Sequence, residues 1–547
     1  MSFSLFSFLF LAITIPIFFL ARGQVRIFVL LAASFAFCYF QDPRALVFLG
    51  ICTGIVYLAG LLEDALINRQ NKKSAAPNSN NAARIAAAVT AILLILLLIL
   101  DKLAFPILRD NLLFSIIPDA VLATHATNAL ITLYFSVGIS YYVFQAISYL
   151  ADIAAGKIRA EKNPFLFALY LCYFPKFLSG PIERPADLLP QLKNTANVLF
   201  FDADRWGSAV YMLLYGYMLK VLAADRITPY RVTIFDNPQV HSWPILIVGM
   251  LLYTMEIYCD FAGYSSIAIG VSRIFGIELS ANFAAPYCSA SITEFWRRWH
   301  MSLSRWLRDY IYIPLGGNRK GQIRRYLNVL AVFVVCGLWH GISWNFLVWG
   351  LLHGLFSIIG TALRTGSDSK GNKKDKQIAR KTLLKAAAGR IVTFVFVSFA
   401  WIFFGMKSLP AAADYIGRMC TGYNGYALDQ AALQAAAEAE GAVTAAAGIT
   451  AAAGAGAASS GFLGELAKEA AGIGLKGQDL LVLITVLVLV VLTDIMSYRK
   501  KQPFPDLWRK VPYLPRYIFT AVLALSILVF GIYGPGYNAG SFMYMAF

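Results

Sequence analysis

Apolar runs of about 20 residues, long enough for a helix to cross a membrane, recur along the chain between short polar segments. The pattern predicts membrane helices over residues 1–21, 25–40, 44–66, 85–107, 128–150, 205–224, 243–260, 327–343, 345–363, 389–406, 480–497 and 515–535. Two further apolar stretches, 164–180 and 262–277, are short or interrupted, so we expect half-spans or re-entrant segments there.

The composition supports this interpretation. Of 547 residues, 59% are apolar and only 14% are charged, whereas a soluble globular chain has about a quarter of its residues charged. The balance excludes a soluble enzyme, a disordered chain and a collagen-like rod. The predicted fold class is therefore an all-α polytopic membrane protein.

The charge distribution predicts an orientation. The net charge is +17, from 47 Lys and Arg against 30 Asp and Glu, and basic residues concentrate in loops on the cytoplasmic side of membrane proteins. The strongly basic loops are Arg69/Lys72/Lys73/Arg84, Arg319/Lys320/Arg324/Arg325, Lys370–Lys385 and Arg499/Lys500/Lys501. Placing them in the cytoplasm puts both termini outside, provided that 164–180 and 262–277 both cross or both turn back. An inner-face site for an anionic cofactor stays open, and no nucleic acid partner is expected.

One segment differs from the rest. Residues 407–479 fall outside by this orientation, and their middle, Ala431–Ser460, consists mostly of Ala and Gly. Alanine favours helix and interspersed glycine weakens it. We expect an external insertion, either a loosely helical partner surface or a tolerated low-complexity loop. The predicted organisation is a membrane domain over 1–406 and 480–547 with this insertion between its parts.

The candidate chemistry begins with the histidines. His340 lies in the sequence Cys336-Gly-Leu-Trp-His-Gly341, inside an apolar run, and His353 follows in the next predicted span. Ionisable groups within a membrane are costly and mark functional sites. A neutral imidazole bound by a backbone carbonyl would be the structural alternative, and we favour that alternative for His353 only.

His300 has a different setting. It ends Phe295-Trp-Arg-Arg-Trp-His300, preceded by Ser291 and Glu294, which match a capping box. Apolar positions continue at helical spacing to Tyr310, with arginines on the other faces, and this predicts a helix lying at or dipping into the inner interface. The turn Ile313–Gly321 follows, and its free amides and basic neighbours could receive phosphates.

A third candidate is the stretch Phe174–Pro185, in which two prolines flank Ser179 and Gly180 and precede Glu183 and Arg184. It predicts irregular backbone at membrane depth, which is tolerated only against protein or water. The stretch could line a cavity or form an interfacial turn.

Three stretches together resemble the membrane-bound O-acyltransferase family, in its bacterial polysaccharide-acetylating branch: Val137–Tyr149, Phe174–Leu192, and Phe295–Ser304 continuing to Trp339-His340-Gly341. The resemblance runs from the N-terminal spans to about Met406 and resumes in the last two spans. It implies a ring of membrane helices, about 11–14 with re-entrant and interfacial helices, around a central tunnel. The Ala-rich insertion departs from the family pattern, as does Gly405, where relatives often have Arg.

The resemblance also implies roles. His340 is expected to be the catalytic histidine and His300 a supporting one. The donor would be a cytoplasmic acyl thioester such as acetyl-CoA, with no resident cofactor or metal. The acceptor would be an exported cell-surface polysaccharide such as alginate, reached through a periplasmic or extracellular hydrolase-like acetyltransferase, and the membrane would be the bacterial inner membrane. Phosphates of the donor would be bound by Arg297, Arg298, Arg319, Lys320 and Arg324.

Three alternatives stay open. D-alanyl transfer or peptidoglycan O-acylation would use the same mechanism. A transporter of a lipid-linked sugar is disfavoured, because no internal repeat is visible and we expect few acidic residues inside the spans. A glycerolipid acyltransferase would need His-x-x-x-x-Asp, but the fifth residue is Asn345 after His340 and Arg305 after His300.

Overall fold

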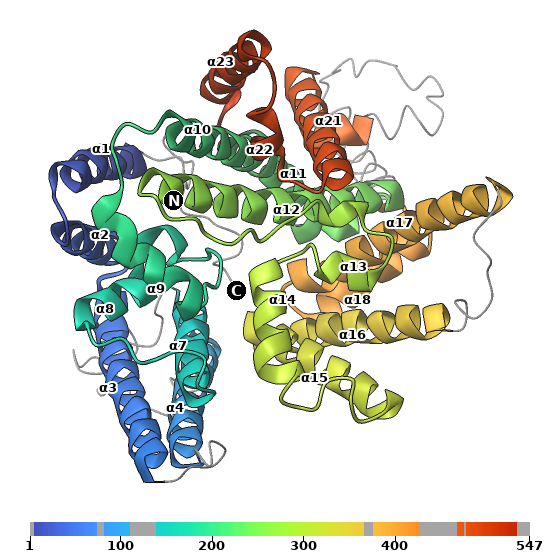
Figure 1. Cartoon of the computed structure of the whole chain (residues 1–547). Helices are drawn as coiled ribbons and strands as arrows, with labels where there is room; N and C mark the ends of the chain where they lie inside the picture. Colours follow the sequence, from blue (N-terminus) through green and yellow to red (C-terminus); the bar gives the residue numbers. More distant parts are fainter. Residues whose placement is uncertain are drawn as a thin grey trace, which may run out of the picture.

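The computed structural model describes residues 5–73, 81–109, 138–365, 376–425, 468–474 and 477–532. Within these ranges the regular elements are helices, arranged in groups around the middle of the molecule (Figure 1). Helices of sufficient length and hydropathy to span a membrane lie at 46–69, 81–100, 203–236, 243–274, 344–362, 384–405, 479–500 and 513–530. The protein is an all-α polytopic membrane protein, as its sequence predicts.

The first group contains α1 (Leu5–Leu20), α2 (Val25–Gln41), α3 (Pro43–Lys73), α4 (Asn81–Arg109) and α7 (Ile139–Ala154). Helices α3, α4 and α7 pack side by side (Figure 1). Short helices α8 (Pro164–Cys172) and α9 (Pro185–Asn194) pack on this group, with a 3₁₀ turn, η1 (Phe174–Lys176), between them. At nine residues, α8 is too short to span, so the interruption expected over 164–180 is confirmed.

The second group is built on α12 (Trp243–Ile274), which packs along α10 (Ala203–Tyr217) and α11 (Asp225–Asp236). A π-helical segment, η3 (Met218–Ala224), joins α10 to α11. The expectation of a separate half-span at 262–277 is wrong, because α12 continues unbroken for 32 residues. In the second half of α12, Gly263 and Gly270 have no side chain and so allow the backbone of α10 to approach closely. The C-terminal helices α21 (Gly477–Lys500), α22 (Phe504–Trp508) and α23 (Tyr513–Phe530) pack on this group.

The third group contains the short helices α13 (Ile292–Trp296) and α14 (Met301–Leu307) and the long helices α15 (Gln322–His340), α16 (Trp344–Thr365) and α17 (Lys376–Gly405). Helix α18 (Leu409–Cys420) packs on α12 and α17. Tyr415 of α18 is buried and donates its hydroxyl to Leu246 O at 2.6 Å. The predicted insertion thus begins with a helix packed on the membrane core, and its Ala-rich middle, 431–460, lies outside the described residues.

Several carboxylates lie inside the candidate spans, so the expectation of few acidic residues there is wrong. Lys220 forms ion pairs with Asp225 at 2.8 Å and with Asp260 at 2.6 Å, and Arg231 pairs with Glu256 at 2.8 Å. Burial of a charge is tolerated when an opposite charge and hydrogen bonds compensate it. These three carboxylates link turns of α11, α12 and η3, which is a structural role.

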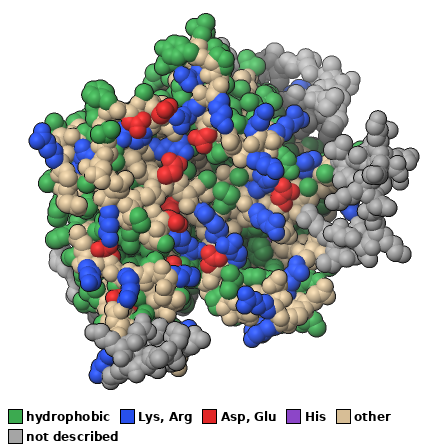
Figure 2. Space-filling view, viewed as in Figure 1, with side chains coloured by type: hydrophobic (Ala, Val, Ile, Leu, Met, Phe, Trp, Pro, Cys, Tyr) green, Lys and Arg blue, Asp and Glu red, His purple; other side chains and the backbone are tan. Residues whose placement is uncertain are grey.

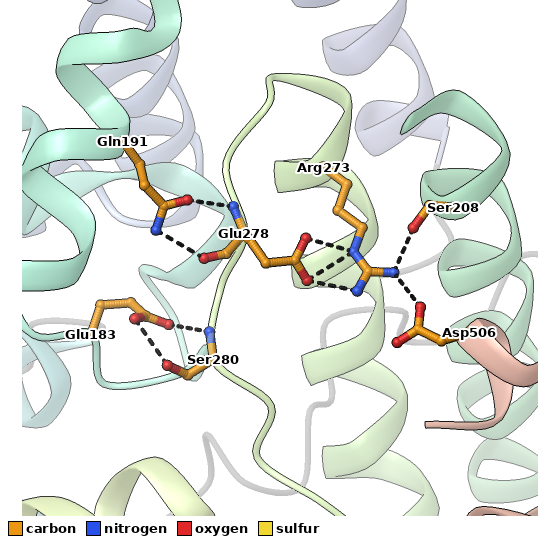
Figure 3. Close-up of polar contacts among 7 residues, drawn as sticks. All are labelled: Glu183, Gln191, Ser208, Arg273, Glu278, Ser280 and Asp506. Carbon is orange, nitrogen blue, oxygen red and sulfur yellow. Dashed lines mark hydrogen bonds and ion pairs between the residues drawn. The ribbon is translucent and has the colours of Figure 1, made fainter. Parts of the chain in front are cut away.

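A polar network holds the extended segment 275–291, which leads from α12 to α13 (Figure 3). Arg273 binds Glu278, Ser208 of α10 and Asp506 of α22. Gln191 of α9 donates to Glu278 O and accepts from Glu278 N, as a strand neighbour would. The helix groups are therefore joined at this segment, which also positions the residues before His300.

Helices α15 and α16 approach closely at two glycines. A Cβ on Gly337 would collide with Phe346 O, and one on Gly350 would collide with Phe333 O. This contact fixes the turn Gly341–Ser343 and hence the position of His340 at the end of α15.

We predict that Gly350→Ala destabilises the protein by about 1–3 kcal/mol, because an added methyl group overpacks the contact between α15 and α16. The measurement is the midpoint of thermal unfolding in detergent. Gly360→Ala is the matched control, since it lies in the same helix with open space around its Cα, and it should be neutral or slightly stabilising. Equal effects of the two variants would contradict the role of the close contact.

Candidate active site

The segment around His300 is not one continuous helix. The capping box is present in part: Ser291 Oγ accepts from Glu294 N at 3.2 Å, while Glu294 accepts from Ala290 N at 2.9 Å. Helix α13 ends at Trp296, and α14 begins at Met301. The predicted uninterrupted amphipathic helix is wrong here, because two backbone groups of the break bind the segment 282–284 instead.

Those backbone bonds define the conformation of His300. Ala284 N donates to Arg298 O at 3.0 Å, and Met301 N donates to Asn282 O at 2.9 Å. His300 consequently adopts φ 42° and ψ 54°, in the left-handed region. A non-glycine residue pays conformational energy there and persists only when its surroundings fix it.

Asn282 and Ser302 supply much of that fixation. Ser302 Oγ donates to Asn282 Oδ1 at 2.6 Å and accepts from Ile182 N at 3.0 Å. Asn282 Nδ2 donates to Ser265 Oγ of α12 at 3.1 Å. All three polar side chains are buried or nearly so. One network thus connects α12, α14 and the irregular stretch 174–184, and sequence patterns gave no signal for Asn282 because it lies in no recognisable motif.

The stretch 174–184 is enclosed by protein. Its residues from Phe174 to Glu183 are buried, and Glu183 accepts from Ser280 N at 2.6 Å. Arg184 donates to Asp309 at 2.9 Å and lies over the ring of Tyr310. The stretch is therefore neither an exposed interfacial turn nor part of the cavity described below.

His340 is the last residue of α15, 5% exposed, inside an aromatic shell. Its ring centroid lies 4.7 Å from Trp339, 5.3 Å from Trp349 and 5.0 Å from Phe404. Lys102 of α4 donates to His340 O at 3.4 Å. That lysine was missed by sequence reasoning, and its place near the end of an otherwise apolar run is the only signal that could have found it. The next residues, Gly341 and Ile342, are partly exposed.

The structure brings His300 and His340 together from separate elements. The ring of Trp339 contacts both, with centroid distances of 6.0 Å to His300 and 4.7 Å to His340. Phe261 covers His300 at 4.7 Å. His300 lies between α12 and α15, outside the candidate spans, and burial lowers the pKa of its imidazole to about 3. The ring is consequently neutral near pH 7.

His353 belongs to the packing around this pair. Its Nδ1 accepts from Trp296 Nε1 at 3.2 Å, and its ring stacks on Phe333 and meets Trp349 and Phe396 edge-on. A histidine held by an indole donor in an aromatic core agrees with the structural role expected for His353.

The predicted phosphate-binding residues fall in two places. Arg319, Lys320 and Arg324 are exposed at the start of α15, where Asn328 Nδ2 donates to Gly317 O at 2.9 Å and braces the turn. Arg297 is exposed beside His300, whereas Arg298 is held by Glu294 at 3.1 Å and by Ala284 O at 3.0 Å. Arg324 and His340 are separated by roughly 24 Å along α15 at 1.5 Å per residue. Lys and Arg outnumber Asp and Glu on the face shown in Figure 2.

A cavity of about 490 Å³ lies between α10, α12 and α21. Asn282, Phe283, Arg298 and Met301 form one wall, and neither His300 nor His340 is among its lining residues. The predicted tunnel to His340 does not coincide with this cavity and stays a prediction.

The fold and these contacts define a polytopic membrane protein in which two buried histidines from separate elements lie among the same aromatic side chains. The model of the membrane-bound O-acyltransferase family matches residues 156–404, which include both histidines and the irregular stretch at 174–184. The chain belongs to this family.

The chain is also similar in sequence to individual acyltransferases. The chain is 38% identical over 286 residues to the probable alginate O-acetylase AlgI of Pseudomonas putida, which covers 52% of this chain and 55% of that protein. It is 33% identical over 314 residues to a peptidoglycan O-acetyltransferase of Helicobacter pylori, covering 53% and 57%. It is 30% identical over 289 residues to a teichoic acid D-alanyltransferase of Streptococcus thermophilus, covering 49% and 67%. The chain thus matches about half the length of the first two relatives.

We predict that His300→Gly is about 1 kcal/mol more stable than His300→Ala, because only glycine adopts the left-handed conformation without strain. Both variants lose the imidazole, so their difference in unfolding free energy isolates the backbone. Ser304 in α14 provides the control, since there glycine should be about 1 kcal/mol less stable than alanine. The same order at both positions would contradict the constrained conformation of His300.

Proposed function

We propose that this protein is a membrane O-acyltransferase that moves an acetyl group from a cytoplasmic acyl thioester, such as acetyl-CoA, across the membrane for O-acetylation of an exported cell-surface polysaccharide. The observation that carries the proposal is the meeting of His300 and His340 around Trp339 in a chain of this family. The alginate O-acetylase relatives favour acetyl as the group and a polysaccharide such as alginate as the acceptor.

The chemistry needs a base at the reacting hydroxyl. As the acceptor oxygen bonds to the acyl carbon, the carbon–sulfur bond breaks, the hydroxyl proton passes to a base, and the thiolate receives a proton. A neutral imidazole can accept that proton near pH 7. In this proposal His340 is the base, and His300 supports it by packing against Trp339, whose ring borders both imidazoles.

The ends of α15 suit the two sides of the reaction. Exposed Arg319, Lys320 and Arg324 lie at its start, where a polyanionic donor would be attracted, and His340 lies roughly 24 Å away at its other end. Because His340 is buried, passage of the acyl group requires its aromatic shell to open. We propose that the protein lies in a bacterial inner membrane, with the basic start of α15 on the cytoplasmic side and both chain termini outside. We further propose that a hydrolase-like acetyltransferase is the external partner that completes transfer.

A second acyl group has support from the relatives. The chain resembles a teichoic acid D-alanyltransferase, and the same base could serve an aminoacyl thioester. The peptidoglycan O-acetyltransferase relative offers a second acceptor class. The transporter alternative has less support, because the acidic residues Asp225, Glu256 and Asp260 are ion-paired within the core.

We predict that His340→Ala lowers acetyl transfer by about 10²–10⁴-fold, the usual contribution of a general base. Membranes containing the chain would receive acetyl-labelled CoA, and label would be followed in extracellular polysaccharide and partner protein. His241→Gln is the control and should retain transfer, because His241 lies at the start of α12 and binds Glu469 instead. If folded His340→Ala retained wild-type activity, His340 would not be the base. If label were transferred only from a D-alanyl thioester, the acyl group would be D-alanyl and not acetyl.

We predict that combined replacement of Arg319, Lys320 and Arg324 by Gln raises KM for acetyl-CoA about tenfold or more, while kcat stays within about twofold, because these exposed cations bind donor phosphates before chemistry. Added salt should raise the wild-type KM and affect the variant less. Lys407→Gln, which removes an exposed cation beyond the end of α17, is the matched control. A fall in kcat with unchanged KM would contradict a role in donor binding.

A further inference from the structure

Asp494 is a buried carboxylate in α21 that faces the cavity between α10, α12 and α21. Its side chain accepts from the hydroxyl of Tyr258 at 2.7 Å, and it is 6% exposed. The buried carboxylates of α11 and α12 have Lys220 or Arg231 as partners, whereas Asp494 has no ion-pair partner among the residues that the structure describes. A buried carboxylate of this kind is costly unless a cation or several hydrogen-bond donors compensate it.

The cavity offers room for such a compensating group. Its volume is about 490 Å³, and Tyr215, Ser265 and Asn282 add aromatic and polar surface beside Asp494. Most of the remaining lining is apolar, including Met212, Ile269 and Phe504. A ligand that fills it would therefore combine a donor-rich polar group with apolar surface.

Positive charge lies at the edge of the same cavity. Lys501 is exposed, lines the cavity and follows the end of α21, seven positions after Asp494. Its φ of 54° is in the left-handed region, where glycine or asparagine ordinarily ends a helix. A lysine held in this strained conformation suggests that its side chain has a use there. Arg298, the second cation of the lining, is already bound to Glu294 and Ala284 O.

The cavity adjoins an apolar part of the molecular surface. A small apolar crevice between α10, α22 and α23 shares Tyr215, Phe504 and Pro505 with it. Helix α23 beyond that crevice exposes apolar side chains such as Leu525 and Val529, which lipid chains would cover. An amphiphile could therefore lie with its apolar part along the exposed face of α23 and turn its polar part into the cavity.

The geometry points to a binding site for a phospholipid whose headgroup carries both a primary ammonium and a phosphate. The ammonium lies at Asp494 and donates to the carboxylate oxygen that Tyr258 leaves available, and the phosphate lies at Lys501. Phosphatidylethanolamine has this chemistry. Phosphatidylcholine lacks N–H donors, and phosphatidylglycerol lacks the cation, so the site distinguishes the three headgroups. This site is separate from the two histidines and does not depend on the proposed reaction.

The test uses the purified full chain in lipid-free detergent, with phosphatidylethanolamine, phosphatidylcholine or phosphatidylglycerol of identical acyl chains added in turn. Lipid binding is measured by native mass spectrometry and by the midpoint of thermal unfolding. We expect phosphatidylethanolamine to bind about tenfold more tightly than either other lipid, as one additional charge-assisted hydrogen bond provides. Equal binding of the three lipids by the wild-type chain would overturn the proposal without any variant.

Variants locate the site. Asp494→Asn should reduce the preference for phosphatidylethanolamine over phosphatidylcholine to about onefold, and Asp204→Asn, an exposed carboxylate 2.9 Å from Arg509, should leave it unchanged. Lys501→Gly removes the cation and relieves the strained backbone, so it should weaken binding of all three lipids while the lipid-free protein becomes more stable. Unchanged lipid binding in Lys501→Gly would contradict the assignment of the phosphate.

Soluble phosphoethanolamine distinguishes a lipid from a free ligand with the same headgroup. We expect millimolar phosphoethanolamine to leave bound phosphatidylethanolamine in place, because it lacks the acyl chains that lie along α23. Complete displacement would show that the cavity takes a soluble ammonium phosphate and would overturn the assignment of a phospholipid.

Discussion

Irregular backbone cannot face the hydrocarbon of a membrane, because its unpaired amides and carbonyls would find no partner there. Among the residues that the structure describes, 174–184 and 275–291 are two such stretches that pack against protein. Each is satisfied by the other and by the surrounding helices: Ile182 N binds Ser302 Oγ, Ser280 N binds Glu183, and Met301 N binds Asn282 O. The helices can be regarded as a shell that keeps lipid away from these contacts.

The same constraint explains why His300 has an unusual backbone conformation. The chain must leave α13 to satisfy the segment 282–284 and then enter α14, and His300 is the residue at which the direction changes. Its imidazole is thereby directed toward Phe261 and Trp339. On the other side, the glycine contact between α15 and α16 fixes His340 at a helix end. The meeting of the two histidines depends on both backbone arrangements.

The buried carboxylates of α11 and α12 are compensated by ion pairs. Lys220 and Arg231 are the partners of these buried carboxylates, and Arg273 joins α12 to α10 and α22. Asp494 departs from this pattern and lines a cavity instead. Paired charges hold helices together, whereas a buried charge without an ion-pair partner beside open volume is where a ligand gains binding energy.

The sequence by itself determined the membrane class, most helix positions and the candidate histidines, because spanning helices need long apolar runs and buried ionisable residues stand out within them. Trp339-His340 and Trp299-His300 were recognisable as local motifs. Only the tertiary structure decided that α12 continues through 262–277, that the helix around His300 breaks, and that Asn282, Lys102 and Asp494 lie where they do. Those outcomes depend on contacts between residues distant in sequence, such as Asn282 with Ser265 and Ser302, and local periodicity carries no information about such partners.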